Sequence, residues 1–198
     1  MLSNDAKSQD LRVRRTRLMI EEAFIELVQE KGFQSITVQD ITDRAMVNRA
    51  TFYDHFTDKY GLFEYSMRNW FKQTLENKLP VGLNYGTSNL GLLIETLGEF
   101  LATLHDHCRP KNPNGLPAFD EQVVDLVTEL LSQWLEERRP GNETSSLALA
   151  ATVGAWAIYG AARHWSSQKH QEPIKSFTAR VAPMIVTLIE QGEGSAVS

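Results

Sequence analysis

At 198 residues and a formal net charge of −5, the chain is long enough to bury a substantial core, and it has no overall excess of positive charge. Hydrophobic residues make up 42% and charged residues 23% of the sequence, which is typical of folded proteins and excludes a long disordered chain. The single cysteine, Cys108, excludes an intramolecular disulfide, and no charged-then-apolar signal segment precedes Leu11. We therefore expect a cytoplasmic protein made of a small domain fused to a larger one.

Positive charge is concentrated near the N-terminus. Residues 7–17 hold five basic side chains and one acidic one, Asp10. Such a run is often only a solvated surface, but it is also a feature of nucleic-acid contact. The most apolar run, residues 147–162, is shorter than the roughly 20 residues that a spanning helix needs and is rich in glycine and alanine. We predict that it is a helix buried in protein and that the chain does not bind membranes.

The apolar pattern predicts an all-α fold, because helical spacing recurs along the chain and sustained alternation typical of strands does not. The first helix is predicted to begin near Arg12 and to end before Gly32, a stop signal. Thr37 stands three residues before Asp40 in a capping-box-like arrangement. It starts a second, short helix that is expected to end near Met46.

Asn48 is a good N-cap for a third short helix that runs through Phe56, and Thr57 can cap a fourth that extends to about residue 79. Turn-rich breaks at 80–89, 109–117 and 139–142 separate the remaining helices. These are predicted at about 90–108, 118–137, 143–167 and 173–191, the last kinked at Pro183. The expected organisation is an N-terminal arm and small domain at 1–57, a larger helical domain at 58–191 and a disordered tail at 192–198.

The two short helices joined by a tight turn form a helix-turn-helix pattern, whose second helix enters the DNA major groove. On that helix, Phe52 and Phe56 are one turn apart and can pack on the preceding helices. Arg49, Ala50, Tyr53 and Asp54 then face away. Arginine can bind guanine or phosphate, threonine and tyrosine hydroxyls can donate to phosphate, and a small alanine permits close approach. Asp54 is either a cytosine acceptor or a solvent-facing charge.

Residues 16–65 resemble the DNA-binding domain of TetR-family transcriptional regulators, through "EKGF", "TVQDI", "ATFYDHF" and "DKYGLF" in register. The resemblance implies phosphate contacts from Thr37 and Lys59, base contacts from Arg49, Ala50 and Thr51, and backbone contacts from Tyr53 and His55. The basic N-terminal segment would approach the flanking duplex. The resulting set of candidate DNA-binding residues is Arg14, Arg15, Arg17, Thr37, Asn48, Arg49, Ala50, Thr51, Tyr53, His55 and Lys59.

Position 46 departs from the family pattern, which often has a glycine at this turn. Here the residue is Met46. Either the methionine adopts a positive φ, at a cost of about 1 kcal/mol, or the turn has a different shape.

The larger domain is expected to hold a dimer interface and an effector pocket, because TetR-like regulators are usually homodimers with an inducer pocket in each subunit. "GAWAIYGAARHW", residues 154–165, also resembles a subgroup of these regulators, and its small residues would let helices approach closely. The interface candidates are Gly154, Ala157, Ile158, Ala161, Trp165, Val181, Ile185 and Leu188; the alternative is a core helix of a monomer. The pocket candidates are Trp70, Phe71, Phe100, Leu104, Phe119, Trp134 and Trp156, although such a set is more often simple core.

Neither a metal site nor an enzyme is predicted. In "HDHC", residues 105–108, the two histidines would point about 200° apart on a helix, so they do not form a chelating pair. The chain has no phosphate-binding glycine loop, no G-x-S-x-G nucleophile elbow and no H-E-x-x-H metalloprotease motif. No cofactor is expected.

The function predicted from the sequence is a ligand-responsive transcriptional regulator, a repressor by family tendency, that binds a pseudo-palindromic DNA operator as a homodimer and responds to a small-molecule effector of unknown identity. The alternative is a helical ligand-binding or interaction protein with a TetR-like fold that has lost strong DNA binding. Net acidity, Asp54 and Met46 favour that alternative.

Overall fold

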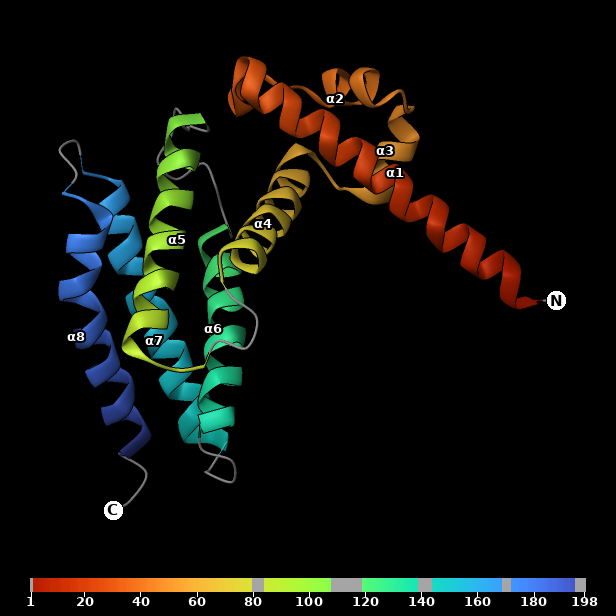
Figure 1. Cartoon of the computed structure of the whole chain (residues 1–198). Coiled ribbons are helices and arrows are strands. Elements are labelled where there is room, and N and C mark those ends of the chain that lie inside the picture. The colour runs from red at the N-terminus through yellow and green to blue at the C-terminus, as the bar shows by residue number, and fades with distance from the viewer. Residues whose placement is uncertain (1, 80–83, 108–118, 139–143, 169–171, 195–198) are drawn as a thin grey trace. The chain divides into compact units, whose positions relative to one another are not determined.

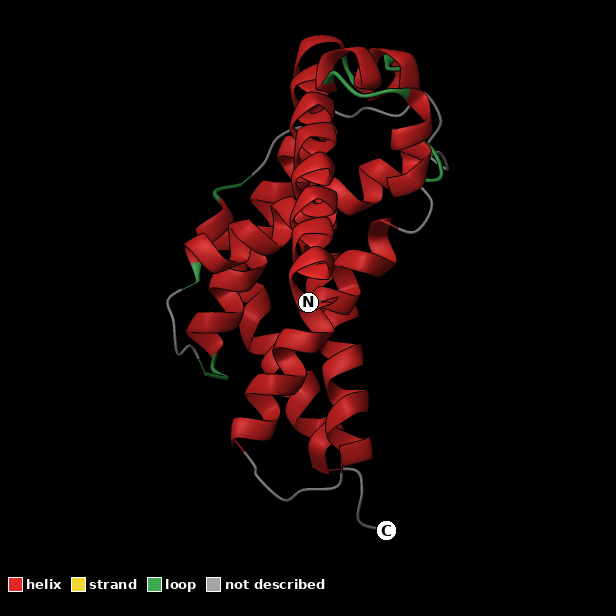
Figure 2. Cartoon of the chain, turned by 90° about the vertical axis from the view of Figure 1, so that its right-hand side faces the viewer, coloured by secondary structure: helices red, strands yellow, loops and turns green. Residues whose placement is uncertain are grey.

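The structure of the protein, a computed structural model, describes residues 2–79, 84–107, 119–138, 144–168 and 172–194. Within these residues every regular element is a helix (Figure 2), so the all-α prediction is confirmed. In chain order (Figure 1) the elements are α1 Leu2–Lys31, a 3-10 helix η1 Phe33–Ser35, α2 Val38–Ala45, α3 Arg49–His55, α4 Lys59–Lys78, α5 Thr87–His107, α6 Phe119–Arg138, α7 Thr144–Ser166 and α8 Ile174–Gly194.

The chain divides into two compact units. The smaller unit contains the described residues up to Met67 together with His107, and the larger contains residues 68–106 and the described residues from Phe119 onward. The division therefore falls within α4, later than the expected boundary after residue 57. Leu62, Phe63 and Met67 of α4 are buried, so the first half of this helix contributes to a core.

The first helix is longer than predicted. It begins at Leu2 rather than near Arg12, and it ends as predicted before Gly32, whose φ is 73°. Residues 2–31 contain neither glycine nor proline, so nothing interrupts the helix. The apolar periodicity located the start of burial, and Ile20 is the first fully buried side chain described in α1. It did not locate the start of the helix, because an exposed helical turn needs no apolar partner.

An aromatic cluster forms the core of the smaller unit. Phe24 of α1 packs edge-on against Phe33 and Phe63, with ring centroids 6.1 and 6.4 Å apart. Phe33 also packs against Phe63 at 4.8 Å and against Tyr60 at 5.4 Å. These rings come from α1, η1 and α4, and edge-to-face pairs of this kind add stability beyond the burial of apolar area.

The larger unit is built from long helices, with α7 packed along both α6 and α8. Gly154 of α7 sits where a Cβ atom would lie only 2.7 Å from the Cδ1 of Ile189 in α8. The glycine therefore permits the two helices to approach closely. At the other end, the indole nitrogen of Trp165 donates to the carbonyl of Glu172 at 2.9 Å. This bond joins α7 to Glu172, two residues before α8.

The predicted start of a disordered tail at residue 192 is wrong. Helix α8 continues to Gly194, and the hydroxyl of Ser146 donates to the carbonyl of Gly192 at 3.2 Å. A Cβ on Gly192 would contact Ala150 at 3.5 Å. Gly192 therefore allows close packing of α8 against α7. Residues 195–198 lie outside the described residues.

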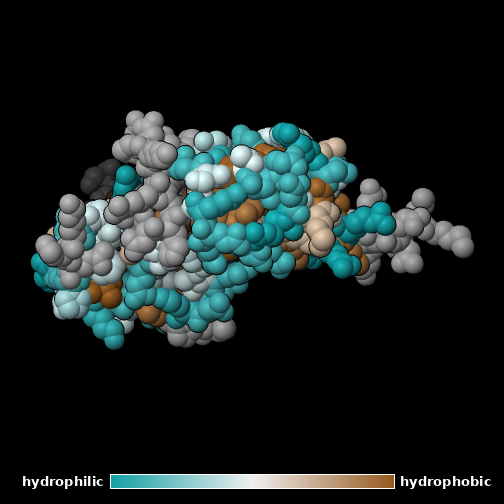
Figure 3. Space-filling model, turned by 90° about the horizontal axis from the view of Figure 1, so that it is seen from above, coloured by the Kyte–Doolittle hydropathy of each residue, from teal (hydrophilic) through white to brown (hydrophobic). Residues whose placement is uncertain are grey.

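The apolar run at 147–162 lies within α7, where Ala151, Ala155 and Ile158 are fully buried. This confirms that it is a helix packed within protein. None of the helices in the described part of the chain combines the length and apolarity needed to cross a bilayer. Seen from above, the surface is mainly hydrophilic, with hydrophobic side chains in scattered places (Figure 3).

Candidate nucleic-acid interface

The start of α2 is a complete capping box. The hydroxyl oxygen of Thr37 accepts from the backbone N–H of Asp40 at 3.1 Å, and the Asp40 carboxylate accepts from the backbone N–H of Thr37 at 2.8 Å. The Thr37 hydroxyl also donates to that carboxylate at 2.6 Å. The N-terminal donors of α2 are thus partly satisfied within the chain, and the cap predicted from the sequence is present.

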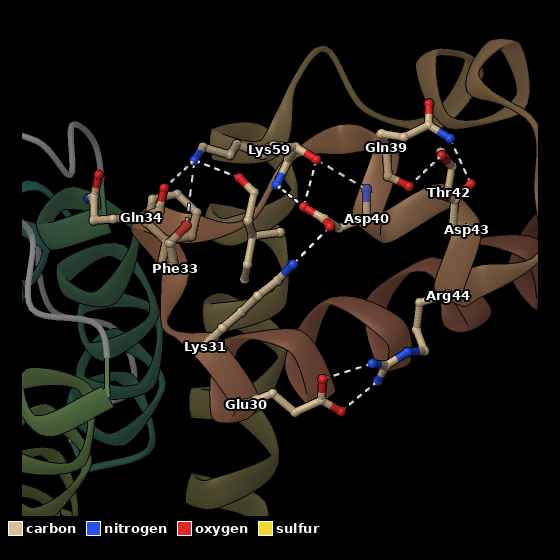
Figure 4. A network of polar contacts seen from close by, with 12 residues as sticks. Glu30, Lys31, Phe33, Gln34, Gln39, Asp40, Thr42, Asp43, Arg44 and Lys59 are labelled. Atoms are coloured by element: carbon tan, nitrogen blue, oxygen red, sulfur yellow. Dashed lines mark hydrogen bonds and ion pairs between the residues drawn. The ribbon is translucent and has the colours of Figure 1, made fainter.

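Ion pairs hold α2 against α1 (Figure 4). Lys31 lies 2.8 Å from the Asp40 carboxylate, and Arg44 lies 2.7 Å from the Glu30 carboxylate. Arg44 also pairs with Glu26 at 2.9 Å. Lys31 and then the Thr37 bonds hold the pKa of Asp40 well below its ordinary value, and Arg44 lowers the pKa of Glu30. These pairs are solvent-exposed, so each adds little stability. Their effect is to fix the direction of α2.

The turn between the two short helices uses a left-handed residue. Met46 has φ 53° and ψ 42°, and it is the one non-glycine residue with positive φ among the described residues. The N–H of Val47 donates to the carbonyl of Thr42 at 3.0 Å, a bond that closes the C-terminal turn of α2 in the manner of a Schellman motif. The first alternative for this position therefore holds: the methionine adopts the strained conformation. Its side chain is 85% exposed.

Helix α3 has one buried side and one exposed side. The Asn48 side chain accepts from the backbone N–H of Thr51 at 2.7 Å, which confirms the predicted N-cap. Phe52 is fully buried, Phe56 is 7% exposed, and their ring centroids are 5.9 Å apart. The aromatic side chains therefore anchor α3 to the smaller unit, as the spacing predicted.

The exposed side of α3 carries the side chains suited to DNA. Arg49, Ala50, Tyr53 and Asp54 are exposed, and Thr51 is half-buried. The guanidinium of Arg49 donates to the Tyr53 hydroxyl at 3.3 Å, and its Cζ lies 6.0 Å from the tyrosine ring centroid. The two side chains one turn apart thus restrict each other before any ligand binds. An arginine held in this way loses less conformational entropy on forming a fork with guanine or phosphate.

Lys59 has a structural role that sequence reasoning missed. Its ammonium donates to the carbonyl of Ile36 at 2.9 Å and lies 3.4 Å from the carbonyls of Phe33 and Gln34 (Figure 4). Partial burial lowers its pKa from the ordinary value. Lys59 therefore ties the start of α4 to the segment after α1. A phosphate contact from Lys59 stays a prediction, and it requires the ammonium to leave these acceptors.

The predicted arginines divide into two kinds. Arg14 and Arg15 are exposed, as a phosphate contact requires. Arg17 instead lies with its Cζ 5.2 Å from the Tyr65 ring centroid and 5.8 Å from that of Phe56. Residue 17 shares a helix face with Ile20 and Phe24 by i, i+3, i+7 spacing, and this signal could have shown that it points inward. The ring of His55 is half-buried beside Phe56.

The predicted effector pocket is only partly assembled. Trp70 and Phe71 of α4 both pack against Phe100, with ring centroids 4.8 and 5.0 Å apart. Leu104 and Trp134 are buried, and the side chain of Phe119 lies outside what the structure describes. Trp156 is 48% exposed. Its place in a pocket stays a prediction.

The residues of the predicted dimer surface differ in their burial within the protomer. Ile158, Ile185 and Trp165 are buried within the protomer, as is Gly154 against Ile189. Gly154 thus serves the packing of α7 on α8 within the protomer, and a contact of these residues with a second copy stays a prediction. Ala157, Ala161 and Val181 are half-buried, and Leu188 is 40% exposed. The exposed large apolar side chains in the described parts of these two helices are Leu149, Val153, Trp156, Met184 and Leu188.

The His105 and His107 side chains are not described, and Cys108 lies outside the described residues. Among the residues that the structure describes, no group of three histidine, cysteine or acidic side chains is arranged to hold a metal ion.

Comparisons with known proteins agree with this geometry. Residues 20–65 match the family model of bacterial regulatory proteins of the tetR family. The chain is 42% identical over 59 residues, 29% of this chain and 16% of the relative, to YxbF of Bacillus subtilis, an uncharacterized helix-turn-helix transcriptional regulator. It is 32% identical over 85 residues, 42% of this chain and 44% of the relative, to DhaS of Lactococcus lactis, a transcriptional activator of the dhaKLM operon. This chain thus aligns with less than half the length of either relative.

Among solved structures, RolR in complex with resorcinol superposes with a TM-score of 0.59 over 96% of this chain and 98% of that one, at 17% identity. This likeness shows the fold. The family-model match lies within the smaller unit and includes α2 and α3.

Proposed function

We propose that this chain, a member of the TetR family of transcriptional regulators, represses its target genes by binding a pseudo-palindromic operator as a homodimer. The observation that supports the proposal is that α3 has one buried side and one exposed side. Phe52 is fully buried, whereas Arg49 and Tyr53 lie together on the exposed side. A helix anchored by its inner face leaves its outer face free for the major groove.

The net charge of −5 does not oppose DNA binding, because the contact is confined to one small surface. The side chains of Asn48 and Thr37 cap α3 and α2. In this proposal they contact DNA at the starts of these helices through the hydrogen-bonding capacity that capping leaves unused. Arg14 and Arg15 approach phosphates that flank the bases read by α3. Because the target is chromosomal DNA, we place the protein in the cytoplasm.

For dimerisation we propose the exposed apolar side chains of α7 and α8. Leu149, Val153 and Trp156 follow i, i+4, i+7 spacing on one side of α7, and Met184 and Leu188 follow i, i+4 spacing on α8. Exposed apolar side chains in a helical row are typical of a surface covered by a partner. A second copy is the appropriate partner, since a two-fold operator is read by a two-fold symmetric protein.

The effector is proposed to act by selecting one spacing of the two recognition helices. A ligand shifts this equilibrium only if it binds the geometry that does not fit DNA more tightly. RolR binds resorcinol in its crystal structure, and by analogy a small molecule is proposed as the effector here. The aromatic cluster of Trp70, Phe71 and Phe100 is the remaining part of the candidate pocket that the structure brings together.

DNA binding is tested by fluorescence anisotropy with fragments of the DNA upstream of its own gene, over a salt series. Wild-type protein should bind in the nanomolar range and weaken steeply as salt rises, because binding releases counterions from phosphates. Arg49→Ala should weaken binding by about tenfold to a hundredfold. Lys72→Ala, at an exposed lysine of α4, removes the same charge elsewhere and should have little effect.

Equal binding by wild type and Arg49→Ala on every fragment would show that α3 does not read DNA. Failure to bind both the upstream fragments and any sequence from a random-DNA selection would favour the alternative, a helical ligand-binding protein with this fold. If specific binding is found, deleting the gene should raise expression of the adjacent target. A fall in expression would make the protein an activator.

The dimer surface is tested with a matched pair of substitutions. Leu149 is 64% exposed on α7 and Leu11 is 61% exposed on α1, so each can be changed to glutamate at similar cost to the protomer. Sedimentation equilibrium should show a dimer for wild type and Leu11→Glu and a monomer for Leu149→Glu. A Leu149→Glu protein that remains dimeric with unchanged affinity would exclude this surface as the interface.

A further inference from the structure

A groove of about 400 Å³ runs between α5 and α8 of the larger unit. None of the predicted pocket residues lines it. Its walls come from the first half of α5 and the first half of α8: Thr87, Ser88, Gly91, Leu92, Glu95, Lys175, Thr178, Ala179, Ala182 and Pro183. Neither the proposed DNA contacts nor the proposed dimer surface uses these residues.

The two helices run in opposite directions along the groove. The Tyr85 hydroxyl, just before α5, donates to the carbonyl of Val186 at 3.4 Å, and farther along α5 Glu95 contacts Thr178. Between these points a Cβ on Gly91 would lie 4.0 Å from the Cβ of Ala182. The hollow exists because small side chains face each other where larger ones would fill the space. It therefore has two distinct ends and an apolar middle.

One end of the groove carries opposite charges. The carboxylate of Glu95 is half-buried, and its Oε1 accepts from the Thr178 hydroxyl at 2.9 Å. Thr178 is only 3% exposed, so this bond holds the carboxylate in place. Lys175 lies one turn earlier on α8 and is exposed. Among the described residues, no carboxylate forms an ion pair with its ammonium.

The middle of the groove contains a backbone acceptor without its usual donor. Pro183 lies inside α8 and has no N–H, so the carbonyl of Ala179 lacks the hydrogen bond that a helix normally supplies from four residues later. Ala179 and Pro183 both line the groove. Beside them, Leu92, Gly91 and Ala182 provide apolar contact area.

The far end carries hydroxyl groups. Thr87 and Ser88 are the first two residues of α5, and both are exposed. They stand about 12 Å along α5 from Glu95, at 1.5 Å per residue. The far end therefore offers hydroxyl groups in the direction in which a ligand side chain would extend along the groove.

We propose that this groove binds a free α-amino acid. The ligand's ammonium donates to the Glu95 carboxylate, and its carboxylate accepts from the Lys175 ammonium. Its side chain lies over Gly91 and Ala182 toward the hydroxyls of Thr87 and Ser88. A zwitterion matches a site with one charge of each sign, whereas a ligand with a single charge leaves one protein charge uncompensated. This site does not depend on the proposed DNA binding.

The test is isothermal titration calorimetry of the full chain, without DNA, against each proteinogenic amino acid at millimolar concentration. At least one should bind. For the tightest binder, the corresponding amine without the carboxylate and the corresponding acid without the amine are titrated next. Each should bind at least about tenfold more weakly, since each loses one charge-assisted hydrogen-bonded pair.

Matched variants locate the site. Glu95→Gln keeps an oxygen that can accept from Thr178 but removes the charge, and Lys175→Met removes the ammonium. Each should weaken binding about tenfold. Glu136→Gln and Lys72→Met make the same changes at exposed positions outside the groove and should bind as wild type does. Ala179→Leu keeps both charges but fills the groove, and it should abolish binding.

The proposal is overturned if no amino acid binds, if binding is unchanged in both Glu95→Gln and Lys175→Met, or if the acid alone binds as well as the zwitterion. Circular dichroism confirms that each variant is folded before titration. The operator-binding experiment is separate, so loss of one proposal leaves the other intact.

Discussion

The smaller and larger units bury their helices in different ways. In the smaller unit, short helices are fixed by polar caps and aromatic rings, so each helix has one inner side and one outer side. In α3 the neighbours Phe52 and Tyr53 are 0% and 49% exposed. In the larger unit, α7 has small or apolar residues around much of its circumference, and Ile158 is buried while Trp156 is 48% exposed.

The difference explains where sequence reasoning succeeded. A clear polar-to-apolar contrast shows which side of a short helix faces inward. A helix rich in alanine and glycine offers no such contrast, so buried and exposed apolar residues look alike in the sequence. The burial predicted for α3 is therefore confirmed, whereas the sequence of α7 did not show that Ile158 and Trp165 are buried within the protomer.

The largest effect is expected from comparing two substitutions in α3. One changes the buried side chain that packs beneath the helix, and the other changes an exposed side chain that is proposed to contact DNA. Phe52→Ala should lower the free energy of unfolding by about 3–5 kcal/mol, because it leaves a cavity beneath the helix. Tyr53→Ala, at the adjacent exposed position, should cost less than about 1 kcal/mol and yet weaken DNA binding. Urea denaturation and anisotropy measure the two properties. Similar losses of stability in both variants would contradict the assignment of Phe52 to the buried side and Tyr53 to the exposed side of α3.

In the larger unit, two glycines of α7 provide the corresponding contrast. A Cβ at Gly154 would lie 2.7 Å from Ile189, whereas a Cβ at Gly160 would have no atom within 4 Å. Gly154→Val should therefore destabilise the protein by about 2 kcal/mol through overpacking. Gly160→Val should change stability by no more than about 0.5 kcal/mol.

Urea denaturation at several protein concentrations checks this pair. If the cost of Gly154→Val arises within the protomer, it is independent of protein concentration. If the loss of unfolding free energy disappears when the protein is diluted, Gly154 lies in the dimer interface, as predicted from the sequence.

A smaller effect is expected at the strained turn. Met46 has φ 53° and is 85% exposed, so its side chain contributes little packing. Met46→Gly should stabilise the protein by up to about 1 kcal/mol, since glycine adopts this conformation without a Cβ clash. Met46→Ala keeps the Cβ and should give no such gain. If both variants behave alike in urea denaturation, the backbone conformation is not the source of the effect.

The smallest effect is an acid sensitivity of the smaller unit. Lys31 and Thr37 lower the pKa of Asp40 in the folded state, so its contribution to stability is present above the unfolded pKa of about 3.9 and is lost as pH falls through the lower folded value. The pKa of Glu30 is also lowered in the folded state, because of its hydrogen bond with Arg44. Stability of the smaller unit should therefore decrease below about pH 4.

The tryptophans help to assign this loss. Trp70, Trp134, Trp156 and Trp165 all belong to the larger unit. At low pH, circular dichroism should detect unfolding of the smaller unit before tryptophan fluorescence changes. Asp40→Asn removes one titrating group. It should bring closer together the pH values at which circular dichroism and tryptophan fluorescence change. Coincident transitions at every pH would show that the units do not differ in acid sensitivity.

The sequence by itself determined the helical class, the short helices of the smaller unit and their caps at Thr37 and Asn48. These features depend on residues within one or two turns of each other, so local chemistry is sufficient to specify them. The match of residues 20–65 to the tetR family model rests on this same local pattern.

Only the tertiary structure decided what depends on distant segments. Lys59 finds its acceptors in the segment after α1, and Gly154 of α7 is buried because it packs against Ile189 of α8. The groove between α5 and α8 arises because Gly91 meets Ala182, and Glu95 meets Thr178, across 83 residues or more of chain. Burial depends on which elements pack together, and the residue pattern of a single helix does not contain that information.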